Sequence, residues 1–407
     1  MNTEKKFFHS NTAIVTLFAA CFVVLISLGV RQTFGLFFID FNESLNISNT
    51  AFGFAIGTQM LMWGLTGPIF GAIADRFGGH VAIISSFLFY TLGVYFLYSG
   101  PNTGIFFQIH LGLLIGIGLG GTAISIPMSI VGKHFPLSTR TIAMSIVTAV
   151  GSFGYFISPI FTSYSLIEYG WNYTLFLFSL FLITGLIAAF FVRSPKENEI
   201  IENQSDQSFK EALSEAFKSK SYVLLVSGFF VCGFHITLVG THVPKYVMDR
   251  GLEDWTAAAI LALIGLFNIF GSLLSGYLST KISKKILLSL IYLLRGFSIA
   301  FFIFTPPSVL SAFIFGASFG FLWLSTVPAT SGIVAHLFGT KFLGLLYGIV
   351  FLSHQIGSFF GAYLGGLFYD LYGSYDYAWY LAILLSIFAS IIHLPIIEKP
   401  VERLQKI

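Results

Sequence analysis

Long apolar runs recur from one end of this 407-residue chain to the other. Each is roughly 20 residues long or more, which is the length that a helix needs to cross a hydrocarbon core of about 30 Å. Hydrophobic residues make up 56% of the chain and charged residues only 10%, so there is too little polar surface to cover a soluble globular protein of this size. The runs therefore predict an all-α membrane protein with about twelve spanning helices.

The distribution of basic residues predicts the orientation of these helices. We place the spans at residues 12–39, 50–73, 81–99, 104–132, 140–166, 172–192, 221–247, 256–279, 285–304, 308–336, 342–369 and 377–396. With the amino terminus in the cytoplasm, the loops and chain ends carry their Lys and Arg on the cytoplasmic side, except Lys245 and Arg250. This asymmetry satisfies the positive-inside rule. We therefore expect a multi-pass protein of a bacterial inner (cytoplasmic) membrane, with both termini in the cytoplasm.

One long polar stretch divides the spans into two sets of six. The expected organisation is an N-terminal six-helix bundle over residues 1–193, a cytoplasmic linker over 194–220 and a C-terminal six-helix bundle over 221–407. Within the linker, apolar side chains recur at helical spacing at Phe209, Ala212, Leu213, Ala216 and Phe217. This segment fits either an amphipathic helix on the inner membrane surface or a solvated connector between the bundles.

The two sets of spans repeat one another. The fourth expected span contains Pro127 and the tenth contains Pro328, while Gly154 and Gly357 occupy the fifth and eleventh. The offset stays near two hundred residues. Parallel repeats of six helices are typical of transporters whose solute site lies between two moving halves.

The loop after the second span resembles a motif of the major facilitator superfamily. It carries Gly71, Asp75, Arg76 and Gly78 at the spacing of the superfamily pattern G-x-x-x-D-R-x-G. The resemblance implies the fold of two pseudo-symmetric six-helix bundles and implies that these four residues form a conformational latch that holds one end state. Gly79 and His80 stand where the superfamily usually has two basic residues.

The second half is similar to the bacterial monocarboxylate and oxalate/formate exchanger branch of that superfamily. The similarity lies in segments 232–235, 241–244, 323–328, 336–339, 353–357, 365–366 and 369–375. It implies a small organic anion as the solute. That branch often carries an arginine in the eighth span for the substrate carboxylate, but the eighth span of this chain has none, and Asn268 is its only strongly polar side chain.

Two arginines lie inside expected spans, Arg31 in the first and Arg295 in the ninth. A charged side chain at mid-membrane costs about 2.5–3.5 kcal/mol on insertion scales, so it usually faces a cavity or a partner. All acidic residues fall in loops or at span ends, with Asp40 the nearest. Fixed positive charge without a membrane-embedded acid favours an anionic solute. Arg31 is the stronger candidate, because the resemblance places the first span at the central cavity and the ninth at the periphery. The alternative for Arg31 is a side chain that snorkels to the outer interface, and the alternative for Arg295 is bonding to backbone carbonyls or Asn268 that holds helices together.

Other polar groups at membrane depth complete the candidate substrate site. His235 and His242 are seven residues apart, hence on one face of the seventh span, where they could bind substrate, carry a proton or bond to a neighbouring helix. His354 and Gln355 are adjacent and so point about 100° apart, which allows one of them to face the cavity. The remaining candidates are Gln59, Asn268 and Trp323.

These features predict a secondary carrier that moves a small organic anion by alternating access, as a proton symporter or an anion exchanger. Two alternatives remain open: a carrier of a larger metabolite, such as an anionic metal chelate (siderophore) or a drug, and a transport-like membrane sensor. The pattern of nucleophile and base that an enzyme needs is not found, nor is a metal-ligand set or nucleotide loop. We therefore expect a monomer in the lipid bilayer without cofactor, metal or nucleic acid.

Overall fold

The computed structural model describes residues 11–193, 207–339 and 341–405, and within these ranges the regular structure is helical throughout. The first half contains α2 (Asn11–Gln32), the 3-10 turn η1 (Phe34–Phe37), α3 (Phe38–Leu45), α4 (Asn49–Phe77), α5 (Gly79–Ser99), α6 (Ile105–Phe107), the π-helical turn η2 (Gln108–Leu114), α7 (Ile115–Thr122), α8 (Ser125–His134) and α9 (Leu137–Ala189). The second half contains α10 (Phe209–Lys218), α11 (Lys220–Asp249), α12 (Asp254–Leu278), α13 (Lys284–Phe304), α14 (Val309–Leu322), α15 (Thr326–Phe338), α16 (Leu343–Tyr372), α17 (Asp376–His393) and α18 (Glu402–Gln405).

Ten of the described helices or helix runs are long and apolar enough to cross a membrane. The twelve-span count stays a prediction, and two features account for the difference. Helix α9 covers the expected fifth and sixth spans in one 53-residue assignment that bends at Gly170, where φ is 77°. Helix α4 corresponds to the expected second span and is 29 residues long, but it is not among the ten because of its polar and small residues.

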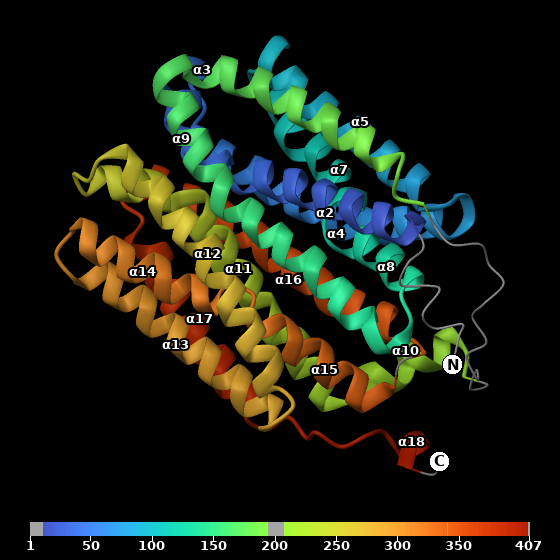
Figure 1. The fold of residues 1–407 in the computed structure, drawn as a ribbon. Helices are drawn as coiled ribbons and strands as arrows, with labels where there is room; N and C mark the ends of the chain where they lie inside the picture. The colour runs from blue at the N-terminus through green and yellow to red at the C-terminus, as the bar shows by residue number, and fades with distance from the viewer. Residues whose placement is uncertain (1–10, 194–206, 340, 406–407) are drawn as a thin grey trace.

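The long helices run side by side between two ends of the molecule (Figure 1). We call the end with α10, α15 and α18 the termini end, and the end with α3 and the start of α4 the far end. Helix α10 lies within the expected linker, of which residues 194–206 are outside the described part. Its N-terminus is closed by a capping box of Ser208 and Glu211, which satisfies two backbone donors that would otherwise lack partners.

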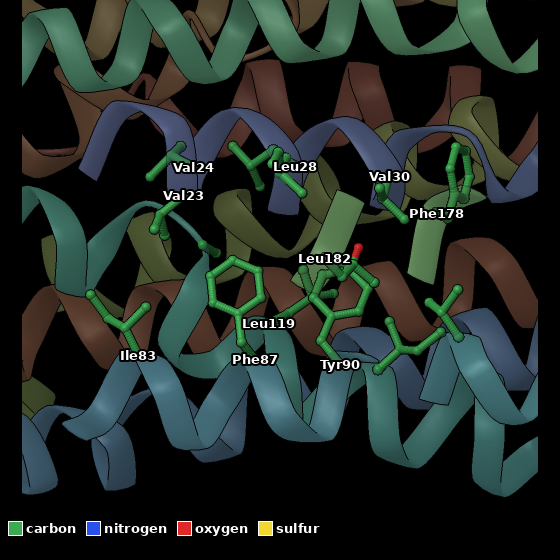
Figure 2. Close-up of a cluster of buried hydrophobic side chains, with 14 of the residues drawn as sticks. Val23, Val24, Leu28, Val30, Ile83, Phe87, Tyr90, Leu119, Phe178 and Leu182 are labelled. Carbon is green, nitrogen blue, oxygen red and sulfur yellow. The ribbon is translucent and has the colours of Figure 1, made fainter. Parts of the chain in front are cut away.

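Each half has its own apolar core. In the first half, Val23, Val24 and Leu28 of α2 face Ile83 and Phe87 of α5, with side chains of α7 and α9 between them (Figure 2). Aromatic and branched side chains fill both cores, and dispersion contacts of this kind are the main attraction between helices once lipid surrounds them. A separate cluster forms the core of the second half.

The two halves meet where α4 packs against α16 and where α9 packs against α12. Toward the far end, a Cβ added at Gly53 would overlap the carbonyl oxygen of Ala362, and one added at Gly57 would lie 2.8 Å from the ring of Phe359. At the termini end, a Cβ added at Gly71, Gly344 or Gly348 would meet nothing within 4 Å. Contact between these helices is therefore tight toward the far end and loose at the termini end.

Glycines on a single helix give a test of this packing. A Cβ at Gly357 of α16 would overlap the carbonyl oxygen of Phe230 on α11, so Gly357→Ala is expected to force these helices apart and to destabilise the protein by about 1–3 kcal/mol. Gly348→Ala on the same helix is the matched control, because it enters open space and gains up to about 1 kcal/mol of helix propensity. Thermal unfolding of the purified variants should show a lower Tm for Gly357→Ala alone. Equal Tm values for both variants would contradict the close α11–α16 packing.

Candidate functional site

Arg31 sits where the first long helix changes geometry. It occupies the last turn of α2, and the chain then tightens into the 3-10 turn η1. Within that turn, Gly35 lies so close to α11 that an added Cβ would overlap the carbonyl oxygen of Gly240. The glycine therefore allows the first half to touch the second half one turn beyond Arg31.

A small cavity lies at this contact. Residues of both halves line it, namely Arg31, Gln32, Phe34, Gly35, Ile56 and Gln59 from the first half and Gly240 and Thr241 from the second. The cavity therefore lies between the halves, where a solute site is expected in a parallel-repeat transporter.

The Arg31 guanidinium has neutral partners. Its Nη1 donates to Oε1 of Gln32 at 3.2 Å, and its Nη2 lies 3.1 Å from the Met60 sulfur. The titratable side chains that interact electrostatically with this guanidinium are the phenols of Tyr155 and Tyr90. Arg31 is only 9% exposed, and within the described residues no carboxylate forms an ion pair with it. A buried cation whose charge is uncompensated strongly favours an incoming anion.

Two amides add polar atoms to the same cavity. Gln32 Nε2 and Gln59 Oε1 are buried and have no hydrogen-bond partner in the described part of the chain. The other end of the Gln59 amide is held, because its Nε2 donates to the Leu111 carbonyl at 3.0 Å. The site thus offers a charged fork, one free amide donor and one free amide acceptor. Such a set suits a small polar anion, whose binding would satisfy groups that are otherwise unpaired.

Trp323 reaches the edge of this cavity. A Cβ added at Gly240 would lie 3.9 Å from the tip of the Trp323 indole, which is itself 1% exposed. The backbone of Trp323 belongs to the break between α14 and α15. Trp323 therefore lies behind Gly240, which lines the cavity.

His235 and His242 bond to neighbouring helices. The Nε2 of His235 donates to the Ala382 carbonyl of α17 at 2.8 Å, and the Nε2 of His242 donates to the Ala362 carbonyl of α16 at 2.7 Å. Both side chains are at most 1% exposed. In this conformation each imidazole joins α11 to another helix of its own half and does not line the Arg31 cavity.

Gln355 lies at the face of α16 that meets the first half, whereas the adjacent His354 ring lies near Phe229 of α11, with ring centroids 5.1 Å apart. His354 Nδ1 is 3.1 Å from Gln355 Oε1, and its ring stacks on Phe351. A Cβ added at Gly64 of α4 would lie 2.9 Å from the Gln355 side chain. Gln355 Nε2 is buried without a partner in the described residues, so this amide keeps a donor for another conformation or a ligand.

Asn268 connects the halves. Its Nδ2 donates to the Ser152 hydroxyl of α9 at 3.0 Å, and its Oδ1 accepts from the Leu324 backbone N–H at 3.0 Å. The first of these bonds crosses between the halves, whereas the second reaches the α14–α15 break. The structure thus gives Asn268 two protein partners outside the Arg31 cavity.

Arg295 lies in a separate cluster. Its Nε and Nη2 donate to the Leu322 carbonyl at 3.0 and 2.6 Å, and Nη2 also donates to the Trp323 carbonyl. These carbonyls belong to the end of α14, which has no following helical turn to satisfy them. Arg295 therefore closes a broken helix, where the negative end of the helix dipole stabilises a cation.

In the first half, the residue at the matching helix position is uncharged. Helices α5 and α13 are both 21 residues long, and Tyr90 occupies on α5 the place that Arg295 occupies on α13. The Tyr90 hydroxyl donates to the Ser27 carbonyl at 2.9 Å, and the Ser27 hydroxyl lies 2.6 Å from that of Thr122 at the α7–α8 break. Tyr90 thus bonds to α2, and Ser27 of α2 bonds in turn to Thr122 at the α7–α8 break.

The expected latch residues lie at the termini end of α4. Asp75 forms an ion pair with Lys133 of α8 at 3.0 Å, within the first half. Gly71 faces open space, and Gly78 ends α4 with φ at 96°, a conformation that L side chains rarely adopt. Arg76 lies over the Phe77 ring at 5.2 Å. In this conformation the ion pair and the ring contact of the loop both stay within one half.

Sequence reasoning did not name Gln32, Thr241 or Tyr155 as site residues. The adjacent Arg31–Gln32 pair in an apolar span was a signal for Gln32, because a second polar group at membrane depth needs a partner or a cavity. For Tyr155 and Thr241 the sequence carries no comparable signal, since their approach to Arg31 and Gln32 depends on contacts between distant helices.

Two sets of helices with separate apolar cores meet at a polar cavity, and comparison with known proteins identifies the family. The sequence matches the Major Facilitator Superfamily profile over residues 20–327. The chain belongs to this superfamily.

Relatives and solved structures agree with the assignment. The MFS-type transporter YcxA of Bacillus subtilis is 23% identical, with 88% of this chain and 89% of YcxA covered. Monocarboxylate transporter 13 of Rattus norvegicus is also 23% identical, with 90% and 85% covered. A bacterial homologue of the human lysosomal transporter Spinster, in an inward-facing and unoccupied conformation, superposes with a TM-score of 0.76 at 16% identity, covering 94% of this chain and 96% of that one. The Escherichia coli fucose:proton symporter superposes with a TM-score of 0.63 at 16% identity, covering 94% and 98%.

Proposed function

We propose that this protein is a secondary transporter that carries a small organic anion, of the monocarboxylate kind, across the membrane by alternating access. The observation that carries the proposal is the Arg31 guanidinium, which lies without a carboxylate partner in a cavity between the halves. The substrate carboxylate would accept hydrogen bonds from Arg31 and from Gln32 Nε2, while Gln59 Oε1 would accept one from a polar group of the substrate. The small cavity favours a small solute.

The topology proposed from the sequence has twelve spans. The ten apolar helices reach this number when α4 and the second arm of α9, beyond Gly170, are added. With both termini in the cytoplasm, the loose termini end would face the cytoplasm and the tight far end would face outward. The protein would then be in an inward-facing state, like the Spinster homologue that it resembles in fold.

Coupling to protons or to a second anion both remain compatible with the site. His235 and His242 already donate to helix carbonyls, so a proton route through either would require that bond to break. His354 has the Gln355 amide oxygen and the rings of Phe351 and Phe229 for neighbours. We therefore propose proton symport through His354 or exchange of one anion for another.

A larger cargo is the second candidate. The described residues of α12 include no arginine for a substrate carboxylate, and one relative at 22% identity is an agnestins efflux protein of Paecilomyces divaricatus. An efflux carrier of a larger acidic metabolite would use the same Arg31 but would need a wider cavity in another conformation.

Matched pairs of ligands test the proposed substrate class. We expect small carboxylic acids to raise the Tm of the purified protein, while the corresponding uncharged amides do not, because only the acid supplies charge to Arg31. A ligand at ten times its Kd stabilises the folded state by about 1.4 kcal/mol. Equal shifts with acid and amide would contradict an anionic substrate, and shifts only with bulky acidic amphiphiles would favour the second candidate over the first.

A further inference from the structure

One carboxylate holds the far end of the two halves together. Asp370, near the end of α16, accepts from the Thr50 backbone N–H at 2.7 Å, from Asn49 Nδ2 at 2.7 Å and from the Asn49 backbone N–H at 3.3 Å. Asn49 and Thr50 are the first residues of α4, so the contact joins the second half to the first. The first turn of a helix has backbone N–H groups without helical acceptors and favours negative charge there.

Contacts of Tyr375 and Gly366 with Asn49 help to hold Asp370 against the start of α4. The Tyr375 hydroxyl donates to Asn49 Oδ1 at 3.1 Å, so both atoms of the Asn49 amide bond to the second half. A Cβ added at Gly366 would overlap the Asn49 carbonyl oxygen. Any larger residue at 366 would therefore separate α16 from the start of α4.

The sequence places a second carboxylate in the corresponding position on α4. Gly366 and Asp370 are four residues apart near the end of α16, and Gly71 and Asp75 are four residues apart near the end of α4. The two helices pack against each other in opposite directions, so each Asp lies toward the start of the other helix. In this structure the halves are joined through Asp370, whereas Asp75 pairs with Lys133 of its own half.

We propose that Asp370, seated on the first turn of α4, is the clasp that keeps the far end closed, and that this end opens only when the carboxylate leaves Asn49 and Thr50. The proposal rests on the proposed function because it assumes that the halves move relative to one another. It assigns a gating role to residues outside the Arg31 cavity and requires no particular substrate.

Distances across the far end test the clasp. Cysteines for spin labels are introduced at the exposed positions Glu43, in the first half, and Tyr377, in the second. Cys21 and Cys232 are buried, and the chain without added cysteines measures any background labelling. The distance distribution is then recorded by pulsed electron resonance for the parent, for Asp370→Asn and for Asp376→Asn.

Asp370→Asn removes the charge and is expected to raise the ratio of open to closed far ends about tenfold, seen as a new long-distance population. Asp376→Asn is the matched control. It changes the same charge at the same end, but the Asp376 backbone N–H donates to the Ser374 hydroxyl within its own half. A distribution for Asp370→Asn identical to that of the parent would overturn the clasp, as would an equal change in both variants.

The distance measurement needs no transport assay, so it distinguishes failure of the clasp from failure of the proposed substrate. Protein that moves no organic anion but opens at the far end in Asp370→Asn would retain the clasp and lose the proposed substrate. Protein that transports the anion but keeps the parent distances in Asp370→Asn would retain the substrate and lose the clasp. A Tm for each variant equal to that of the parent confirms that folding is unaffected.

Discussion

Arg31→Ala in proteoliposomes is expected to abolish uptake of a small organic anion while leaving the protein folded. Among the described residues, Arg31 bonds to a neighbouring amide and a thioether, so its removal leaves no buried acid of this part of the chain unpaired. Removing one partner of a buried charge pair costs about 2–5 kcal/mol of binding, which is roughly 30-fold to several thousand-fold in Kd. The measurement compares initial uptake rates of a radiolabelled anion by the parent and Arg31→Ala proteins, with the Tm of each as the folding control.

Two further variants sharpen this prediction. Arg31→Lys should restore only part of the uptake, because an ammonium group keeps the charge and loses the two-pronged geometry. Lys210→Ala removes an exposed positive charge on α10, far along the chain from the cavity, and should transport like the parent. Wild-type uptake by Arg31→Ala would remove Arg31 from the substrate site.

Arg295→Met is expected to lower the Tm strongly while leaving the affinity of folded protein for the anion intact. Arg295 satisfies the Leu322 and Trp323 carbonyls at the α14–α15 break, and each buried acceptor left unpaired costs about 1–3 kcal/mol. Relief from burying a charge offsets part of this loss. We expect net destabilisation of about 2 kcal/mol, measured by thermal unfolding in detergent. A parent-like Tm would show that the break does not depend on the guanidinium.

The two arginines show which part of the candidate site can be predicted from the sequence and which part cannot. Both were predicted from the cost of charge inside a membrane, and that cost is visible in a single sequence. The preference for Arg31 over Arg295 came from the family resemblance, which places the first span at the central cavity, because the residues alone do not show what lies opposite each side chain. Arg31 meets a cavity between the halves, whereas Arg295 meets the carbonyls of a broken helix.

Helix positions were predicted more closely than helix shapes. The expected span 285–304 corresponds to α13 (Lys284–Phe304), because the limits of a predominantly apolar run fix both ends. The expected span 308–336 is instead divided into α14 and α15. Arg295 of α13 supports this break. Neither hydrophobic periodicity nor composition predicts such a contact between two helices.

The far-end contact of Asp370 could not be predicted from the sequence. Asp370 stood within a segment used for family resemblance, but its partners Asn49 and Thr50 are more than three hundred residues away along the chain. Nothing in local composition links them. Only the packing of α16 on α4 shows that the carboxylate reaches the start of a helix in the other half.

Equilibrium binding of one small carboxylate to the parent, Arg31→Ala and Arg295→Met proteins, each corrected for its folded fraction, tests the central claim most directly. An uncompensated guanidinium between the halves predicts that Arg31→Ala loses binding by at least about 30-fold, while Arg295→Met keeps the parent Kd. Binding that survives in Arg31→Ala and disappears in Arg295→Met would contradict the account and move the anion site to the second half.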